Sequence, residues 1–311
     1  MQKIIYDTYG NADVLRKVES EKPSLPDNHV LVKVMAGGVN PLDFKLRSGA
    51  LKWVVPSHFP RVPGAEVAGV VEESNSPFFK AGNKVFAMLS SQGGGYSEYL
   101  SIKEQLVCPM PKNVSFEEAA VIPLAALTAL QALRDKGRAD RDKTVLINGA
   151  SGGVGMYAVQ VAKVYGATVT GVCSGKNVDF VKSLGADKVI DYQQQDFTRS
   201  DKQYDIVFDA VGKSTYFRCR PIITSKGVYV STLPSFGLML KQLINVFSSR
   251  KGYLIICKPG RDDLEVLRKI TEEGNLKTHI DHIYNLEEAA DAHRHIEKGR
   301  VRGKLVIKMN H

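Results

Sequence analysis

Short apolar runs, separated by glycine and proline turns, fill the first third of the chain. Valines alternate with other residues over residues 29–36, which predicts a strand that is buried on at least one face and that Gly37 and Gly38 then break. Residues 40–48 are predicted to form a short helix with Pro41 in its first turn. Further short strands are expected at residues 3–8, 66–73, 84–88, 96–102 and 105–109. Closely spaced strands of this kind predict a partly closed β-barrel.

The pattern changes near Ser115, which together with Glu118 resembles a helix-capping box. A helix follows at residues 124–134, and from residue 143 onward strands alternate with helices. One strand each is expected around Val145, Val169, Val189, Ile206, Val228 and Leu254. This alternation predicts a doubly wound parallel sheet of about six strands, that is, a Rossmann-type α/β domain.

The last elements of the chain are expected to return to the first domain. They are a helix at 262–273, a strand at 279–284, a helix at 286–298 and a strand at 304–309. The predicted division is therefore residues 1–120 and 263–311 for the barrel domain and residues 121–262 for the parallel-sheet domain.

Residues 144–155 carry the most specific local pattern, because a β-branched apolar run leads into a glycine-rich turn and then a helix. This order forms the phosphate cradle of dinucleotide-binding units. Small residues let the backbone approach a pyrophosphate, and the helix start offers free N–H groups and a positive dipole end. A second strand, a helix and a third strand follow, which favours cofactor binding over an ordinary tight turn. The candidate pyrophosphate residues are Ala150, Ser151, Gly152, Gly153 and Val154.

Composition and net charge exclude only a few classes of function. The net charge of +9 suits anionic ligands, nucleic acid or an acidic membrane. Because no single run concentrates this charge, a solvated basic surface is the favoured interpretation, and neither macromolecular partner is favoured. No apolar run reaches the roughly 18 residues of a membrane span, and no secretory signal region is recognisable. The four cysteines are far apart, which predicts reduced thiols and a cytoplasmic location.

Several segments together resemble the medium-chain dehydrogenase/reductase superfamily over almost the whole chain. They are residues 36–45, 63–69, 94–99, 148–155, 183–187 and 302–304. Within the superfamily, the chain is similar to the quinone oxidoreductase branch and to its relatives that reduce alkenals and enones. The resemblance implies a GroES-like catalytic domain interrupted by the nucleotide-binding domain, an active site in the cleft between them, and a homodimer paired through the nucleotide-binding domain.

One departure from the superfamily pattern concerns zinc. Zinc-using relatives place a cysteine where this chain has Asn40 and a histidine where it has Ala65, and neither replacement can serve as a zinc ligand. No metal site is therefore expected. His293 and His295 lie two residues apart on a predicted helix, point to different faces and make a poor metal pair, so they are expected at the surface.

The end of the second strand bears on which nicotinamide cofactor binds. NAD sites of this fold carry an acidic residue there, whereas residues 171–177 contain none. Ser174 can donate to a phosphate and Lys176 can neutralise it. The resemblance adds Tyr192 as a neighbour of the 2′-phosphate. Lys176 could instead be a solvated helix residue, but a cation is mildly unfavourable at a helix start, so NADPH is favoured.

The other candidate site residues come from the resemblance, and alternatives stay open for most of them. Thr128 matches a position near the nicotinamide, although its hydroxyl could equally bond its own backbone. Asp209 and Val211 follow the fourth strand and should pass the ribose, but Asp209 could also cap the next helix. Arg302 and Lys304 are further candidates for holding the cofactor. Asn40 could bond a substrate carbonyl or a ribose hydroxyl, cap a helix, or do both.

The predicted function is NADPH-dependent reduction of quinones or α,β-unsaturated carbonyls by direct hydride transfer, because no Cys, Ser or His sits in a recognisable nucleophile setting. Negative charge that develops on the substrate oxygen during hydride transfer needs a hydrogen-bond donor to stabilise it. Lys45 is the first candidate, with a solvated helix lysine as the alternative interpretation, and Asn40 is the second. An enoyl thioester reductase is less favoured because residues 44–53 lack the tyrosine that those relatives use. A protein that binds NADPH and associates with RNA or a membrane surface, with little turnover, is an alternative of another class.

Overall fold

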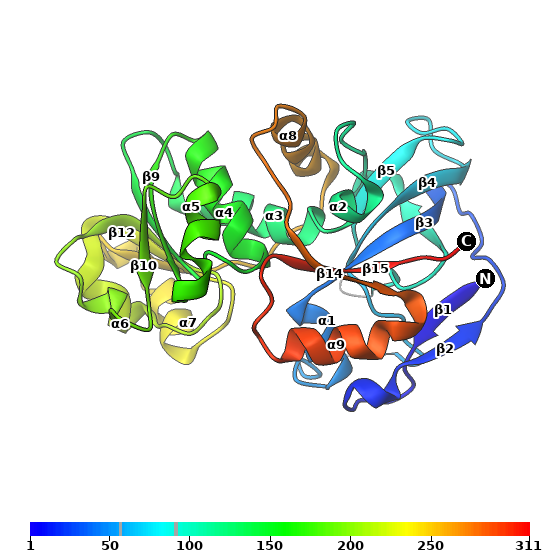
Figure 1. Ribbon diagram of the computed structural model, residues 1–311, viewed down its shortest axis with the longest axis horizontal. Coiled ribbons are helices and arrows are strands. Elements are labelled where there is room, and N and C mark those ends of the chain that lie inside the picture. Colours follow the sequence, from blue (N-terminus) through cyan, green and yellow to red (C-terminus); the bar gives the residue numbers. More distant parts are fainter. Residues whose placement is uncertain (56–57, 90–92) are drawn as a thin grey trace. The chain divides into compact units, whose positions relative to one another are not determined.

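The computed structural model describes residues 1–55, 58–89 and 93–311, and its chain divides into two compact units (Figure 1). Unit 1 comprises Met1–Leu124, Pro259–Glu273 and Thr278–His311, and unit 2 comprises Ala125–Lys258 and Gly274–Lys277. The chain thus crosses between the units after residues 124 and 258, where the sequence predicts boundaries after 120 and 262. A short piece of the returning segment also joins unit 2.

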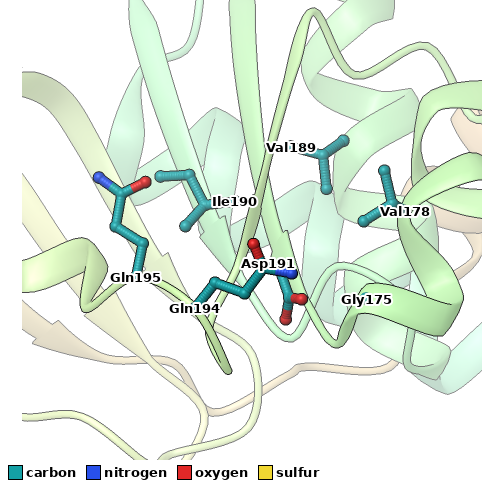
Figure 2. A pocket seen from close by; sticks show the side chains of 7 residues that line it. All are labelled: Gly175, Val178, Val189, Ile190, Asp191, Gln194 and Gln195. Atoms are coloured by element: carbon teal, nitrogen blue, oxygen red, sulfur yellow. The ribbon is translucent and has the colours of Figure 1, made fainter.

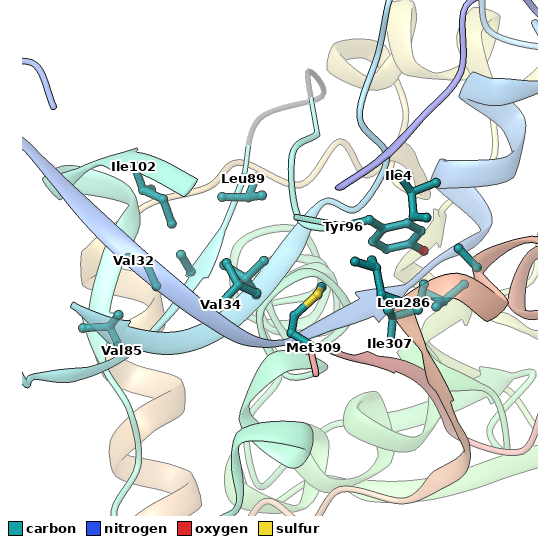
Figure 3. Packing of buried hydrophobic residues seen from close by; sticks show 14 of the residues in the cluster. Ile4, Val32, Val34, Val85, Leu89, Tyr96, Ile102, Leu286, Ile307 and Met309 are labelled. Atoms are coloured by element: carbon teal, nitrogen blue, oxygen red, sulfur yellow. The ribbon is translucent and has the colours of Figure 1, made fainter. Parts of the chain in front are cut away.

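Unit 1 is built on a seven-stranded sheet with the order β14-β15-β3-β4-β5-β7, in which β6 also pairs with β3. The strands are β3 (His29–Val39), β4 (Glu66–Ser74), β5 (Lys84–Met88), β6 (Tyr99–Lys103), β7 (Val107–Pro109), β14 (Ile280–Asn285) and β15 (Lys304–Lys308). A two-stranded sheet of β1 (Gln2–Ile5) and β2 (Arg16–Glu19) accompanies it. Because β15 pairs antiparallel with β3, the end of the chain completes the same sheet as its beginning. Apolar side chains from these distant segments, such as Val34, Tyr96 and Ile307, pack in one core (Figure 3).

The glycine pair in β3 does not end the strand, contrary to the sequence prediction. Strand β3 continues through Gly37 and Gly38 to Val39. A Cβ on Gly38 would overlap the carboxylate of Glu66, and one on Gly37 would lie 2.8 Å from the carbonyl oxygen of Gly95. These glycines therefore admit neighbouring groups that approach the strand closely, and pairing with β4 and β15 keeps the backbone extended.

Unit 2 contains six parallel strands in the order β10-β9-β8-β11-β12-β13. They are β8 (Thr144–Asn148), β9 (Thr168–Cys173), β10 (Lys188–Asp191), β11 (Tyr204–Asp209), β12 (Ile223–Ser231) and β13 (Lys251–Leu254), and each contains the residue predicted for it. The intervening helices are α4 (Gly153–Val164), α5 (Val178–Ser183), α6 (Tyr216–Cys219) and α7 (Phe236–Leu243). The strand order reverses between β8 and β11, which confirms the doubly wound sheet and marks the position where such sheets bind ligands.

The remaining helices lie largely where the apolar pattern predicts them. They are α1 (Pro41–Arg47), α2 (Phe116–Ala120), α3 (Pro123–Gln131), α8 (Arg261–Glu272) and α9 (Ala289–Glu297). The Ser115 capping box at α2 is confirmed, since Ser115 and Glu118 exchange backbone and side-chain hydrogen bonds. None of the helices in the described part of the chain is long and apolar enough to cross a membrane.

His293 in α9 is fully buried, so the expectation of a surface histidine was wrong for it. Its ring meets that of Tyr96 edge to face, with the ring centroids 5.7 Å apart. Burial lowers the pKa of His293 to about 3, with a smaller contribution from the nearby positive charge of Arg47. The imidazole is therefore neutral at physiological pH and packs as a core side chain.

Candidate active site

The glycine-rich turn of unit 2 joins β8 to α4. Its backbone is fixed to the neighbouring strand, because the amides of Gly149 and Ala150 both donate to the carbonyl of Val172 at 3.0 Å. A Cβ on Gly155 would overlap the Gly149 carbonyl oxygen and lie 2.8 Å from the Cα of Ala150, so helix α4 can pack against the turn only through glycine. Alanine at this position would force backbone atoms apart.

Gly152 has a different role in the same turn. It is the N-cap of α4, and as glycine it has no side chain to satisfy the first amides of the helix. A Cβ on Gly152 would make only an ordinary 3.5 Å contact with the protein. The protein itself does not require glycine there, whereas a phosphate approaching the helix start does. Together with Ala150, Ser151, Gly153 and Val154 on the same turn, this geometry fits a bound pyrophosphate.

A second loop lies beside the turn at the end of β9. The side-chain amide of Asn177 donates to both Ser151 and Ser174, at 3.2 Å each, and so ties the two loops together. Sequence reasoning missed this role of Asn177. Lys176 is exposed on a short 3₁₀ turn of this loop, and the Tyr192 side chain, just after β10, is 57% exposed. The three residues expected at a 2′-phosphate thus all belong to segments at the carboxyl ends of β9 and β10.

The end of the second strand, β9, carries no carboxylate, as the sequence predicts. A carboxylate does lie at the same edge of the sheet, at the end of the third strand, β10. Asp191 ends β10 in register with Cys173 of β9. A Cβ on Gly175 would lie only 2.7 Å from an Asp191 carboxylate oxygen. Burial and this carboxylate raise the pKa of Cys173 to about 11. Asp191 is one of the residues that line a pocket of about 580 Å³ (Figure 2). The pocket is lined by Gly175, Val178, Val189, Ile190, Asp191, Gln194 and Gln195. The pairing of β9 with β10 brings Asp191 there.

Asp209 lies at the end of β11 and is fully buried. Its carboxylate accepts from the amides of Gly212 and Ser214 at 2.9 Å, from the Asn148 side chain and from the Tyr229 hydroxyl. The alternative role for Asp209, as the cap of the next helix, does not hold, because Thr215 caps α6. Asp209 instead shapes the turn that holds Val211 against Gly149 at the reversal of strand order.

Unit 1 contributes a buried trio of Asn40, Glu66 and Lys304. The Lys304 ammonium bonds the Asn40 side-chain oxygen and lies 2.8 Å from Glu66 Oε1, and the Asn40 side-chain amide donates to the same Glu66 oxygen at 2.8 Å. All three side chains are nearly inaccessible to solvent. Glu66 Oε2 accepts the backbone amide of Leu124 at 2.7 Å. Sequence reasoning missed Glu66, although Gly38 opposite it is the glycine that makes room for its carboxylate.

Asn40 precedes α1 as expected, but its side chain is committed to this trio. At the helix start, the Asn40 backbone amide donates to the Asp43 carboxylate at 2.7 Å. Ala65, at the other position where zinc-using relatives have a ligand, is buried. Among the side chains of residues 1–55, 58–89 and 93–311, no group of three or more His, Cys, Asp or Glu residues is arranged to hold a metal ion.

The remaining predicted residues lie in varied surroundings. Lys45 is half-buried on α1, and this burial lowers its pKa. Thr128 is buried within α3 in unit 2. Arg302 in unit 1 donates to the ring of His279 at 3.2 Å. The structure thus gathers the turn, the Ser174 loop and the Asp209 turn in unit 2, and gathers Asn40 and Lys304 in unit 1.

Comparison with known proteins identifies the family. Residues 26–112 match the alcohol dehydrogenase GroES-like domain, and residues 184–307 match a domain described as zinc-binding dehydrogenase. The chloroplastic quinone-oxidoreductase homolog of Spinacia oleracea is 36% identical over 99% of this chain and 98% of its own. The chloroplastic NADPH-dependent alkenal/one oxidoreductase of Arabidopsis thaliana is 33% identical over 99% and 79%.

The solved structures agree with the sequence comparison. The quinone oxidoreductase from Coxiella burnetii superposes with a TM-score of 0.90 at 32% identity, covering 100% of this chain and 99% of that one. The similarity therefore includes the residues of both units. The chain belongs to the medium-chain dehydrogenase/reductase superfamily, within its quinone oxidoreductase branch.

Proposed function

We propose that this protein is an NADPH-dependent oxidoreductase that reduces quinones or α,β-unsaturated carbonyls by direct hydride transfer, without zinc. The observation that carries the proposal is the buried trio of Asn40, Glu66 and Lys304. It provides a fixed hydrogen-bonding group and a buried ammonium–carboxylate pair at the position where zinc-using relatives have metal ligands. The names of the relatives, which refer to quinones and to alkenals and enones, support the substrate class.

The choice of cofactor rests on the geometry of unit 2. The glycine turn would hold the pyrophosphate at the start of α4, and Ser174, Lys176 and Tyr192 would hold the 2′-phosphate. NADPH, when bound, would supply the hydride. A relative described as NADPH-dependent supports this choice.

The trio fixes the orientation of the Asn40 amide. Its oxygen accepts from Lys304 and one of its N–H bonds points to Glu66, which leaves the second N–H bond for a substrate carbonyl or a ribose hydroxyl. We propose that Lys45 stabilises the negative charge that builds on the substrate oxygen, since a partly desolvated ammonium interacts more strongly with such a charge than a fully solvated one. Lys45 or water would then deliver the proton.

The same trio supports the proposed independence from zinc. Zinc would have to bind beside the buried ammonium of Lys304, with an amide and a methyl group in place of its usual thiolate and imidazole ligands. We expect elemental analysis of the purified protein to find no stoichiometric zinc and chelators to leave its activity unchanged. Stoichiometric zinc, together with activity lost to a chelator and restored by zinc, would overturn this part of the proposal.

The central experiment is a turnover screen with NADPH and, in parallel, with NADH. Quinones, alkenals, enones and enoyl thioesters form its four substrate groups. We expect the highest kcat/KM with a quinone or an enone and a preference for NADPH. Fast turnover of enoyl thioesters alone would identify the other enzyme class. NADPH binding without turnover of any substrate group would favour a binding protein.

We also propose the homodimer and the cytoplasmic location that the sequence suggests. Strand β13 is the outer strand of the sheet in unit 2, but the backbone groups of Gly252 and Leu254 are already bonded by the side chains of Asn245 and Gln242. A dimer would therefore use side-chain contacts rather than added strand pairing at these groups. Sedimentation equilibrium tests the mass, and imaging of the fluorescently tagged full chain tests the location.

A further inference from the structure

Three buried side chains of unit 1 carry polar atoms that no group in the described part of the chain bonds. They are Arg47, Tyr96 and His293, whose exposed fractions are 1%, 0% and 0%. The atoms without a protein partner are Nε and Nη1 of Arg47, the hydroxyl oxygen of Tyr96 and both ring nitrogens of His293. Buried polar atoms almost always have a hydrogen-bond partner, because an unpaired one keeps the full cost of its removal from water. These atoms therefore need a hydrogen-bonding partner from outside the chain.

The three side chains lie together where α1 packs against α9. The Arg47 guanidinium, at the end of α1, bonds the Glu297 carboxylate of α9 through Nη2. His293 lies one helical turn before Glu297, so both side chains are on the same face of α9. The His293 ring meets the Tyr96 ring edge to face, with the ring centroids 5.7 Å apart. Arg47 and Tyr96 thus both lie beside His293.

The charges around the two rings support this placement. Burial lowers the pKa of His293 to about 3, and the positive charge of Arg47 lowers it further. Burial raises the pKa of Tyr96 well above its usual value, the charges of Asp43 and Glu66 raise it further, and the charge of Arg47 opposes the rise. The guanidinium therefore lies close enough to act on both rings, and the His293 imidazole is neutral at physiological pH.

The donors and acceptors among the unpaired atoms determine the chemistry of the partner. Arg47 offers only N–H donors, and a neutral imidazole offers one donor and one acceptor. The partner must therefore accept from Arg47 and donate to the unprotonated nitrogen of His293. An anion such as chloride cannot donate, and the Glu297 carboxylate already balances the charge of Arg47. A cation would be repelled by the guanidinium. Water both accepts and donates, and it is small enough for an interior site.

We propose that Arg47, Tyr96 and His293 bind one or more internal water molecules inside unit 1. The water would accept from Arg47 and donate to the His293 ring, and the Tyr96 hydroxyl would complete its hydrogen bonds. It would thereby connect α9 to the end of α1, the helix that begins after Asn40 and carries Lys45. The site would be occupied whichever substrate the protein reduces, so it does not depend on the proposed activity.

Oxygen-17 magnetic relaxation dispersion of the full chain tests the proposal in solution, because its amplitude reports water that is held inside a folded protein. His293→Phe replaces the imidazole with an apolar ring, so we expect the amplitude to fall by about one water molecule or more. His295→Phe is the matched control and should leave the amplitude unchanged, since His295 lies in the same helix but is partly exposed and bonds the Tyr284 hydroxyl. Equal amplitudes in wild type and His293→Phe, or equal losses in both variants, would overturn the proposal.

A crystal structure of the wild-type protein gives a second measurement, which does not require any variant to fold. We expect solvent density within hydrogen-bonding distance of an Arg47 N–H group and of a His293 ring nitrogen. Crystals soaked in sodium bromide distinguish the possible occupants, since bromide scatters anomalously and water does not. A bromide peak at this position would identify an anion site and overturn the proposal. Direct hydrogen bonds among the three side chains, with no density between them, would also overturn it.

Discussion

At the residue scale, Asp43 and His293 are buried ionisable side chains of unit 1, and they change the free energy of unfolding in opposite directions as the pH falls. Burial raises the pKa of Asp43 to about 7, even though the backbone amides of Asn40 and Gly64 donate to its carboxylate. Burial lowers the pKa of His293 to about 3. In each case, removal from water disfavours the charged form.

The two shifts predict compensating pH dependences. As the pH falls from 8 to 5, Asp43 takes up a proton in the folded but not the unfolded state, which adds roughly 2–3 kcal/mol to the free energy of unfolding. His293 takes up a proton only in the unfolded state over the same interval, which removes about 2 kcal/mol. Compared with wild type, Asp43→Asn should therefore lose stability on acidification, and His293→Leu should gain it. Urea unfolding at both pH values measures this, and identical pH slopes in all three proteins would contradict the assignment.

Lys176 and Asp191 predict how the cofactors are distinguished. Lys176→Ala should weaken NADPH binding about ten- to hundredfold, the effect of losing a hydrogen bond to a charged group, and leave NADH binding unchanged. Asp191→Asn should tighten NADPH binding relative to NADH, because it removes a negative charge near the same loop. Fluorescence titration with both cofactors measures the ratio. Lys182→Ala, an exposed lysine of α5, is the matched control. Equal losses for both cofactors in Lys176→Ala would place the lysine away from the 2′-phosphate.

Substitution of Lys45 is expected to affect turnover. If its ammonium stabilises the developing charge, Lys45→Met should lower kcat about 100-fold or more, as with the loss of one oxyanion donor, and leave NADPH affinity unchanged. Lys80→Met removes an exposed lysine elsewhere in unit 1 and should behave as wild type. Turnover of Lys45→Met within twofold of wild type on the best substrate would transfer the role to Asn40 or to solvent.

At the element scale, substitutions at two glycines of the same turn are expected to differ in their effect on stability but not in their effect on NADPH binding. Gly155→Ala pushes a methyl group into backbone atoms of the turn, so it should lower the free energy of unfolding by about 1–3 kcal/mol and also weaken NADPH binding. Gly152→Ala meets only an ordinary contact, so it should change stability much less and still weaken NADPH binding. Thermal unfolding with and without NADPH gives both quantities. Unchanged NADPH affinity in Gly152→Ala would mean that no phosphate approaches the helix start there.

At the whole-molecule scale, the chain enters unit 2 twice, the second time at Gly274–Lys277. The side chain of Gln160 in α4 hydrogen-bonds to this second segment. This side chain bonds both backbone groups of Lys277, at 2.7 and 2.9 Å. Gln160→Met would remove both of these hydrogen bonds to the backbone of Lys277, so we expect a loss of about 1–3 kcal/mol in the free energy of unfolding. Gln203→Met, which removes one exposed hydrogen bond, should cost well under 1 kcal/mol. Urea denaturation compares the two variants, and similar costs would show that segment 274–277 contributes little.

The sequence determined the elements because their signals are local. Apolar periodicity located all six strands of unit 2, and the strand, glycine turn and helix at residues 144–155 identified a phosphate cradle through the order of adjacent residues alone. Ser115 and Glu118 marked a helix start because a capping box lies within four consecutive residues. The combination of local motifs also identified the family.

Only the tertiary structure decided which distant residues meet. The parallel pairing of β9 and β10 brings Asp191 to Gly175, and the pairing of β15 with β3 brings Lys304 to Asn40. His293 is buried because packing against the rest of the unit decides which face of a helix is covered. Composition and spacing along the chain carry no record of such neighbours. The elements therefore follow from the sequence, whereas the environment and charge of each site residue depend on the fold.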